Sequence, residues 1–290
     1  MRIVLVLMMA LPAMSQGEDN IAHRNATKIA DIEYAYVGEQ SLKLDLYLPP
    51  VKDAPLLVWV HGGAWRSGSR SPLPLAEFLA AGYAIASIDY RLSTQARFPA
   101  NIHDIKAAVR FLRAKQNEYG FDATKIAVVG ASAGGHLVAL AGTTNGDARL
   151  EGVVGEHLDQ SSDVQAIVSY FGASNLTSIL KQSTPHGLSV RVPALKLLLG
   201  GVPDDQPELA RLASPVFHVD RFDPPLLLLH GDQDPQMPIN QSHELHGQYK
   251  AAGLKVRFEV LHGAGHGGGV FYDKERSASV LMFLDGVLQK

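Results

Sequence analysis

Six short runs of apolar residues constrain the fold of this chain more than any other feature. Each run is apolar on both faces of the strand it would form, and the six lie at residues 55–60, 84–89, 125–129, 166–171, 225–230 and 256–261. Strands of this kind are typical of parallel sheets whose two faces are covered by helices. Two earlier runs, 31–37 and 42–48, alternate apolar with polar residues around a GEQS turn and predict a hairpin with one solvated face.

Helical stretches separate the buried runs. Residues 101–120 repeat apolar side chains at the helical period, and shorter helical stretches occupy 75–82, 134–142, 240–253 and 275–289. Strand–helix alternation after an antiparallel start predicts an α/β fold. We expect a mostly parallel, doubly wound sheet with helices on both faces.

Residues 172–215 interrupt this alternation, because they separate two predicted strands by far more than a usual connection. The segment VPALKLLLGG within them suggests a short helix. Long insertions of this kind are commonly lids or binding elements. We therefore expect one catalytic domain over residues 16–290 with a short cap-like insertion at about 172–215.

The first 15 residues are typical of a secretory signal peptide. Arg2 supplies the positive start, residues 3–11 the apolar centre and AMS at 13–15 a small-residue cleavage site. The apolar centre is shorter than the roughly 20 residues that span a bilayer. We expect a secreted or periplasmic protein without stable membrane insertion; a buried N-terminal strand or a retained anchor is the alternative.

Composition narrows the chemistry. The net charge of −3 without a dense basic run argues against nucleic acid as a partner. The chain has no cysteine, which excludes disulfides, thiol catalysis and cysteine-ligated zinc. His262 and His266 have the spacing of helical zinc ligands, but they lie in a glycine-rich loop. We expect neither a metal nor another cofactor.

The stretch GASAGG at 130–135 lies between a predicted strand and a predicted helix. It matches G-x-S-x-G in the strand–turn–helix context that this motif requires. Large side chains two residues before and after Ser132 would collide in so sharp a turn, and glycine at both positions avoids this. Ser132 is thus a candidate nucleophile; a tight packing corner is the alternative.

Candidates for an acid and a base follow later strands. Asp232 and Asp234 come just after the strand at 225–230, at the sheet edge where open α/β sheets bind ligands. His262 and His266 follow the last strand. The glycines around His266 form a loop that can bring its imidazole over the serine, so His266 is favoured as the base.

With these motifs the chain resembles the α/β-hydrolases of the esterase and lipase group. It is most similar to carboxylesterases that include acetyl-xylan and feruloyl esterases, and the resemblance spans about residues 30–288. The order Ser132, acid, histidine is the order of that fold. The family pattern H-G-x-x-D implies Asp234 as the acid of the triad, with His266 as its partner.

The segment HGGAW at 61–65 resembles the H-G-G-G oxyanion loop of the same group. The resemblance implies that the backbone N–H groups of Gly63, Ala64 and Ala133 form the oxyanion hole. Ala64 replaces the third glycine and is expected either to narrow the pocket or to shift the acyl preference. Trp65 either lines the substrate pocket or covers the core; the sequence leaves both possibilities open.

The expected function is a serine carboxylic-ester hydrolase that acts through an acyl-enzyme on short-chain acyl or aromatic-acid esters, including carbohydrate-linked ones. A serine peptidase of the prolyl oligopeptidase type is the main alternative, since it shares the fold and the triad order. Alanines flank Ser132 where those peptidases usually carry an aromatic residue. A non-catalytic binding protein on this fold would lack triad members, and none is missing.

Overall fold

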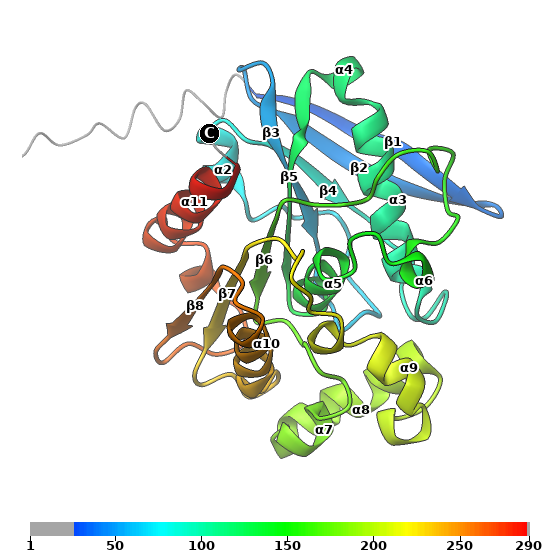
Figure 1. Cartoon of the computed structure of the whole chain (residues 1–290), viewed down its shortest axis with the longest axis vertical. Helices are drawn as coiled ribbons and strands as arrows, with labels where there is room; N and C mark the ends of the chain where they lie inside the picture. The colour runs from blue at the N-terminus through cyan, green and yellow to red at the C-terminus, as the bar shows by residue number, and fades with distance from the viewer. Residues whose placement is uncertain (1–25, 289–290) are drawn as a thin grey trace, which may run out of the picture.

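The computed structural model describes residues 26–288, and the predicted signal peptide lies outside them. In the described part, strands form one sheet in the order β1-β2-β4-β3-β5-β6-β7-β8 (Figure 1). They are β1 (Thr27–Val37), β2 (Gln40–Leu48), β3 (Ala54–Val60), β4 (Ala84–Ile88), β5 (Phe121–Ala131), β6 (Ala166–Tyr170), β7 (Leu226–Gly231) and β8 (Val256–Leu261). Every run that the sequence predicted to be a strand is one, although several bounds differ.

The pairing also agrees with the sequence pattern. β1 pairs antiparallel with β2, and β2 pairs antiparallel with β4; all other neighbours are parallel. The β1–β2 turn needs only two residues, with Val37 opposite Gln40, and Gly38 takes a positive φ of 60° there. The parallel strands therefore end at one edge of the sheet, where loops from different parts of the chain meet.

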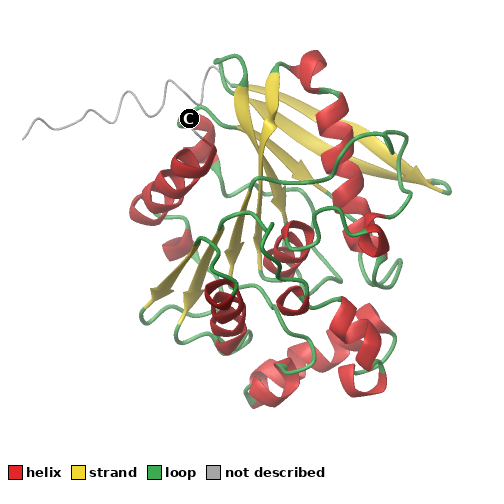
Figure 2. Cartoon of the chain, in the orientation of Figure 1, coloured by secondary structure: helices red, strands yellow, loops and turns green. Residues whose placement is uncertain are grey.

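Helices cover both faces of the sheet (Figures 1 and 2). One face packs against α3 (Ala100–Ala114), α5 (Ala133–Gly142) and α10 (Asn240–Ala251), and the other against α2 (Ala76–Ala80) and α11 (Lys274–Leu288). Within β3, Leu56, Val58 and Val60 join the first core while Leu57 and Trp59 join the second. Strands that are buried on both sides account for the continuous apolar runs in the sequence.

Short helices that the sequence did not predict lie outside this alternation. The helical stretch at 101–120 divides into α3 and α4 (Gln116–Tyr119), and α6 (Ala148–Glu151) follows α5. Such short elements carry too few residues for a periodic pattern to appear.

The insertion is a small helical layer. It contains α7 (Ile179–Gln182), α8 (Pro185–Leu199), η1 (Pro203–Asp205), α9 (Pro207–Leu212) and the start of η2 (Pro215–Phe217). Its apolar side chains, among them Ile179, Leu195 and Leu198, are buried in the same core as one face of the sheet. α8 is longer than the short helix expected from the sequence. Thr184 caps it eight residues before the apolar run that starts at Val192, and Pro193 is tolerated inside the helix.

A further 3-10 turn, η3 (Gly269–Phe271), follows β8 and leads into α11. Among residues 26–288, no helix combines the length and the apolar character that crossing a membrane requires.

Candidate active site

Ser132 lies at a strained turn between β5 and α5. Its backbone has φ 56° and ψ −116°, a region that residues other than glycine rarely adopt. The Ser132 N–H donates to the carbonyl of Tyr170 on the neighbouring strand β6 at 2.9 Å, which holds the turn in place. The strain is compatible with G-x-S-x-G only because its neighbours are small.

Glycines around the serine are required by close backbone packing. A Cβ on Gly130 would lie 2.5 Å from the carbonyl oxygen of Gly134. A Cβ on Gly134 would lie 2.0 Å from the carbonyl oxygen of Val60 at the end of β3. The next residue, Gly135, packs equally closely against the carbonyl of Tyr170. Side chains at positions 130 and 134 would therefore collide, as the sequence predicted. The backbones of β3 and β6 restrict the space further.

A row of hydrogen bonds joins the three residues that the sequence singled out. The imidazole Nε2 of His266 lies 2.9 Å from Ser132 Oγ, and its Nδ1 lies 2.6 Å from Asp234 Oδ2. Since the carboxylate only accepts, Nδ1 carries the proton and Nε2 is left free to accept the serine proton. Loops after three different strands, β5, β7 and β8, bring these side chains together.

Asp234 is buried yet ionised. Its Oδ1 accepts two backbone N–H groups, from Gln236 and Met237, both at 2.8 Å. Its Oδ2 also lies 3.3 Å from Nε2 of His230. Burial alone would raise the pKa of Asp234, but hydrogen bonds from His230 and His266 outweigh it and hold that pKa well below its usual range. The Asp234 carboxylate is therefore charged at neutral pH.

The alternative acid and base form a separate pair. His262 Nδ1 lies 2.8 Å from Asp232 Oδ2, and the His262 side chain is 85% exposed. Asp232 also accepts the N–H of Gly263, so it organises its own turn. The structure thus brings Asp234 and His266 to Ser132 and leaves Asp232 and His262 at the surface.

The loop after β3 lies directly against the serine turn. A Cβ on Gly62 would come within 3.3 Å of the Cβ of Ser132. Gly63 and Ala64 both have positive φ, 103° and 51°, and the Gly63 carbonyl accepts the N–H groups of Arg66 and Ser67. In the described residues the N–H groups of Gly63 and Ala64 donate to no acceptor.

Ala133 supplies the third N–H group of the expected oxyanion hole. It is the first residue of α5, where backbone N–H groups have no partner within the helix. Small residues and an unusual backbone therefore leave unpaired donors on both sides of Ser132.

Trp65 belongs to the core. Of the two possibilities that the sequence left open, the one in which Trp65 lines the substrate pocket is therefore wrong. Its side chain is fully buried, and its indole N–H donates to Nδ1 of His136 at 3.0 Å. His136 Nε2 in turn donates to the carbonyl of Ala213 at 2.6 Å. Burial, opposed in part by this bond, lowers the pKa of His136 to about 4, so the imidazole is neutral and can accept from Trp65.

Two supporting residues escaped the sequence analysis. His136 lies four residues after the serine, and asking where its buried ring nitrogens bond would have drawn attention to it. Phe171, at the end of β6, has a positive φ of 39°, and its ring meets His266 edge-on with centroids 4.8 Å apart. No local pattern marks Phe171, because its role depends on the position of a loop almost a hundred residues later.

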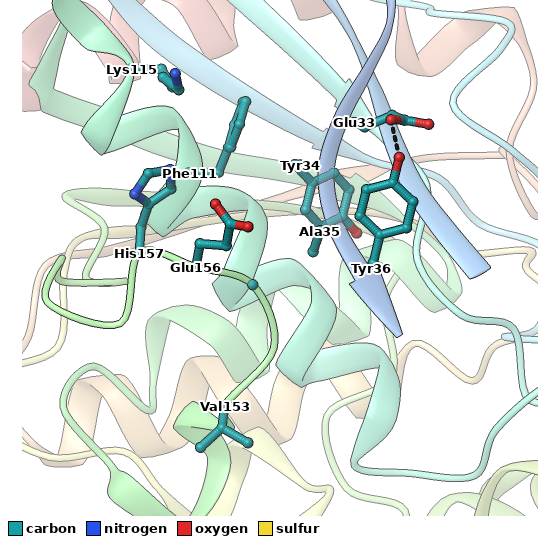
Figure 3. A pocket seen from close by; sticks show the side chains of 10 residues that line it. Glu33, Tyr34, Ala35, Tyr36, Phe111, Lys115, Val153, Glu156 and His157 are labelled. Carbon is teal, nitrogen blue, oxygen red and sulfur yellow. Dashed lines mark hydrogen bonds between the residues drawn. The ribbon is translucent and has the colours of Figure 1, made fainter. Parts of the chain in front are cut away.

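A separate hollow of about 520 Å³ lies away from this site (Figure 3). It is formed by β1, the end of α3 and the loop at 153–157, and its lining includes Tyr36, Phe111 and His157. None of the residues around Ser132 contributes to it. No group of three or more metal-ligating side chains occurs within residues 26–288.

One family profile and several known proteins are similar to this chain. The profile of the family BD-FAE matches residues 44–249. Esterase LipC of Mycobacterium tuberculosis is 37% identical over 222 residues, which cover 75% of this chain and 54% of LipC.

Two solved structures share the fold at 33% identity. One is described as a truncated form of carbohydrate esterase from gut microbiota (TM-score 0.79; 91% of this chain and 97% of that chain). The other is a bifunctional GH43-CE of Bacteroides eggerthii (TM-score 0.81; 90% of this chain and 35% of that chain). The chain spans just over half the length of the curated relatives that it matches first.

Proposed function

The chain belongs to the BD-FAE family and has the α/β-hydrolase fold, and on that premise we propose that it is a serine carboxylic-ester hydrolase. In this proposal Ser132 is the nucleophile, His266 the general base and Asp234 the acid of the triad. The observation that carries the proposal is the row of hydrogen bonds from Asp234 through His266 to Ser132 at the strained turn.

The reaction proceeds through an acyl-enzyme. His266 Nε2 takes the Ser132 proton as Oγ bonds to the ester carbonyl carbon, and the N–H groups of Gly63, Ala64 and Ala133 stabilise the negative oxygen. The carbon–alkoxide bond then breaks, and the alkoxide takes the proton from His266. Water, deprotonated by the same histidine, releases the acid and restores the serine. Asp234 holds the tautomer and stabilises the imidazolium.

The substrates are esters of short acyl or aromatic acids, including esters on carbohydrate. The two solved neighbours at 33% identity, one called a carbohydrate esterase and one a bifunctional GH43-CE, support the carbohydrate link. The relatives named above are described as esterases, and no observation favours the peptidase alternative.

An ester panel tests the proposal. Acetyl, butyryl and feruloyl esters, acetylated xylan and a matched peptide amide are offered to the wild type and to Ser132→Ala. We expect turnover of the esters and loss of at least about 10³-fold in kcat for the variant, whose fold is checked by circular dichroism. Peptide-amide turnover that equals ester turnover, or an unchanged Ser132→Ala variant, would contradict it.

Export through residues 1–15 belongs to the same proposal and is supported by the sequence pattern alone. Mass spectrometry of the protein recovered outside the cytoplasm should find the chain shortened by about 15 residues. Recovery of full-length chain from that fraction would contradict cleavage.

A further inference from the structure

Arg191, in the middle of α8, is a buried cation that forms no ion pair with any residue of 26–288. It is 1% exposed, and its Nε and Nη1 find no hydrogen-bond partner among the described residues. Buried charges are normally paired, because transfer of a bare charge from water costs several kcal/mol. A position that keeps such a charge needs a reason beyond packing.

The contacts of Arg191 reach both sides of the candidate active site. Its Nη2 lies 3.4 Å from the carbonyl of Gln236, in the loop whose N–H groups bind Asp234. Its guanidinium carbon lies 5.9 Å from the ring centre of Trp65, on the oxyanion loop. One side chain of the insertion therefore touches the acid loop and the oxyanion loop at once.

Neighbouring residues of the insertion fasten the same acid loop. Thr184, the N-cap of α8, donates its hydroxyl to the carbonyl of Pro235 at 2.7 Å. One turn later, Gly187 packs so closely that a Cβ would lie 3.0 Å from the carbonyl of Gln236. Arg191 is the third contact in this line and the only charged one of the three.

Arg191 keeps its charge in this buried position. Burial lowers the pKa of Arg191 to about 10, while the Asp234 carboxylate raises it and Arg66 lowers it. Arg191 thus stays cationic near neutral pH. The charged and titratable groups that interact with it are Asp234, Arg66 and His136, whose pKa it lowers.

We propose that Arg191 is a positioning residue of this active site: it holds the Asp234 loop against the loop that carries Trp65 and the candidate oxyanion donors Gly63 and Ala64. The inference rests on the proposed ester hydrolysis. Its consequence is that the acid and the oxyanion donors keep their alignment around Ser132 only while the Arg191 side chain fills this position.

Neutral and charged replacements separate the charge from the packing. Arg191→Met and Arg191→Gln remove the charge, and Arg191→Lys keeps it; Lys196→Met removes an exposed charge from the same helix as a control. Loss of the guanidinium contacts should let the Asp234 loop and the Trp65 loop separate, so that the triad and the oxyanion donors lose their alignment.

We expect kcat to fall about tenfold in both neutral variants with KM within about threefold of the wild type, since the oriented loops act mainly in the transition state. Arg191→Lys keeps a cation and should retain kcat within about threefold of the wild type. Lys196→Met should leave kcat unchanged.

The Nδ1–H proton of His266, which hydrogen-bonds to Asp234, is observed by NMR in the Ser132→Ala background and reports the alignment without turnover. Loss or displacement of this resonance in the neutral variants, with retention in Arg191→Lys, supports the proposal. An unchanged resonance and an unchanged kcat in the neutral variants overturn it. If the wild type hydrolyses no ester, the proposed function fails, while the NMR resonance still decides the role of Arg191. If one neutral variant does not fold, the other gives the result.

Discussion

At the scale of single residues, the glycines around Ser132 show how little freedom the site has. The space next to Gly134 is filled by the backbone of β3, which cannot move without moving the sheet. Adding a side chain at position 134 therefore tests how closely β3 packs against the turn between β5 and Ser132.

We expect Gly134→Ala to lower the free energy of unfolding by about 2–4 kcal/mol and to abolish ester turnover, because its Cβ would lie 2.0 Å from the Val60 carbonyl oxygen. Urea unfolding and the ester assay measure the two effects. Gly247→Ala, in α10 where a Cβ meets nothing, is the matched control and should stabilise by about 0.5–1 kcal/mol. If Gly134→Ala and Gly247→Ala changed stability and turnover equally, the backbone around Gly134 would not be tightly packed.

The two Asp–His pairs at the sheet edge allow a direct test of the acid. Asp234→Asn should lower kcat by about 10³–10⁴-fold at neutral pH, because an amide cannot hold the same histidine tautomer. Asp232→Asn breaks only the exposed pair with His262 and should change kcat less than about twofold. Steady-state kinetics on one soluble ester decides between them, and the reverse ranking would reassign the acid.

At the scale of elements, a buried hydrogen bond from the indole of Trp65 to His136 helps to hold the loop at 61–65 in place. Trp65→Phe leaves the buried Nδ1 of His136 without a donor, which costs about 1–3 kcal/mol. The N–H groups of Gly63 and Ala64 should then lose their alignment, so we expect kcat to fall more than KM rises. Thermal unfolding and kinetics measure both.

Trp59→Phe provides the control for that prediction. Trp59 is also buried, but its indole N–H has no partner among the described residues. Its replacement should cost only the lost packing and leave kcat unchanged. A similar loss of kcat in both variants would mean that the Trp65 hydrogen bond does not position the loop.

The loop that precedes β7 carries Asp223, a carboxyl group whose pKa is raised. Burial, with the charge of Asp220, raises the pKa of Asp223 to about 7. Between the unfolded value near 4 and this value, the folded state binds the extra proton, so stability falls as pH rises through that range. We expect Asp223→Asn to be more stable than the wild type by on the order of 1–3 kcal/mol at pH 8 and equal to it near pH 4.

Urea unfolding at pH 4, 6 and 8 measures this difference. Asp204→Asn, on the exposed turn η1, should show no pH-dependent gain. A gain for Asp223→Asn that is the same at every pH would rule out the titration as its cause.

At the scale of the whole molecule, the sequence predicted what local pattern and chain order control. The apolar runs identified each strand, and because parallel strands end at one edge, Ser132, Asp234 and His266 could be expected to meet there. The position of Trp65 could not be predicted, since it depends on His136, which lies 71 residues later in the chain. The part played by Arg191 depends on where the insertion packs, which no periodic pattern specifies.

The insertion shares its core with the sheet, so we expect the two to unfold together. Leu176, Leu195 and Leu198 share one continuous core with Val58 and Ile126 of the sheet. The Phe98 N–H donates to the carbonyl of Leu198, and Gln241 of α10 accepts the N–H groups of Ser174 and Asn175 at the base of the insertion. To open as a lid, the insertion would have to expose this core and break these bonds. It is therefore part of the cooperative unit.

We accordingly expect residues 26–288 to unfold in a single calorimetric transition, and amides of α8 to exchange with solvent only slightly faster than those of β5. Differential scanning calorimetry and hydrogen exchange measured by mass spectrometry test this together. Ile179 and Leu198 are both fully buried in the insertion. Replacing either with alanine should lower the free energy of unfolding by about 2–5 kcal/mol and leave a single transition. A second, earlier transition, or α8 amides that exchange as fast as an exposed loop, would show instead that the insertion moves independently and that the contact between Arg191 and the acid loop is not permanent.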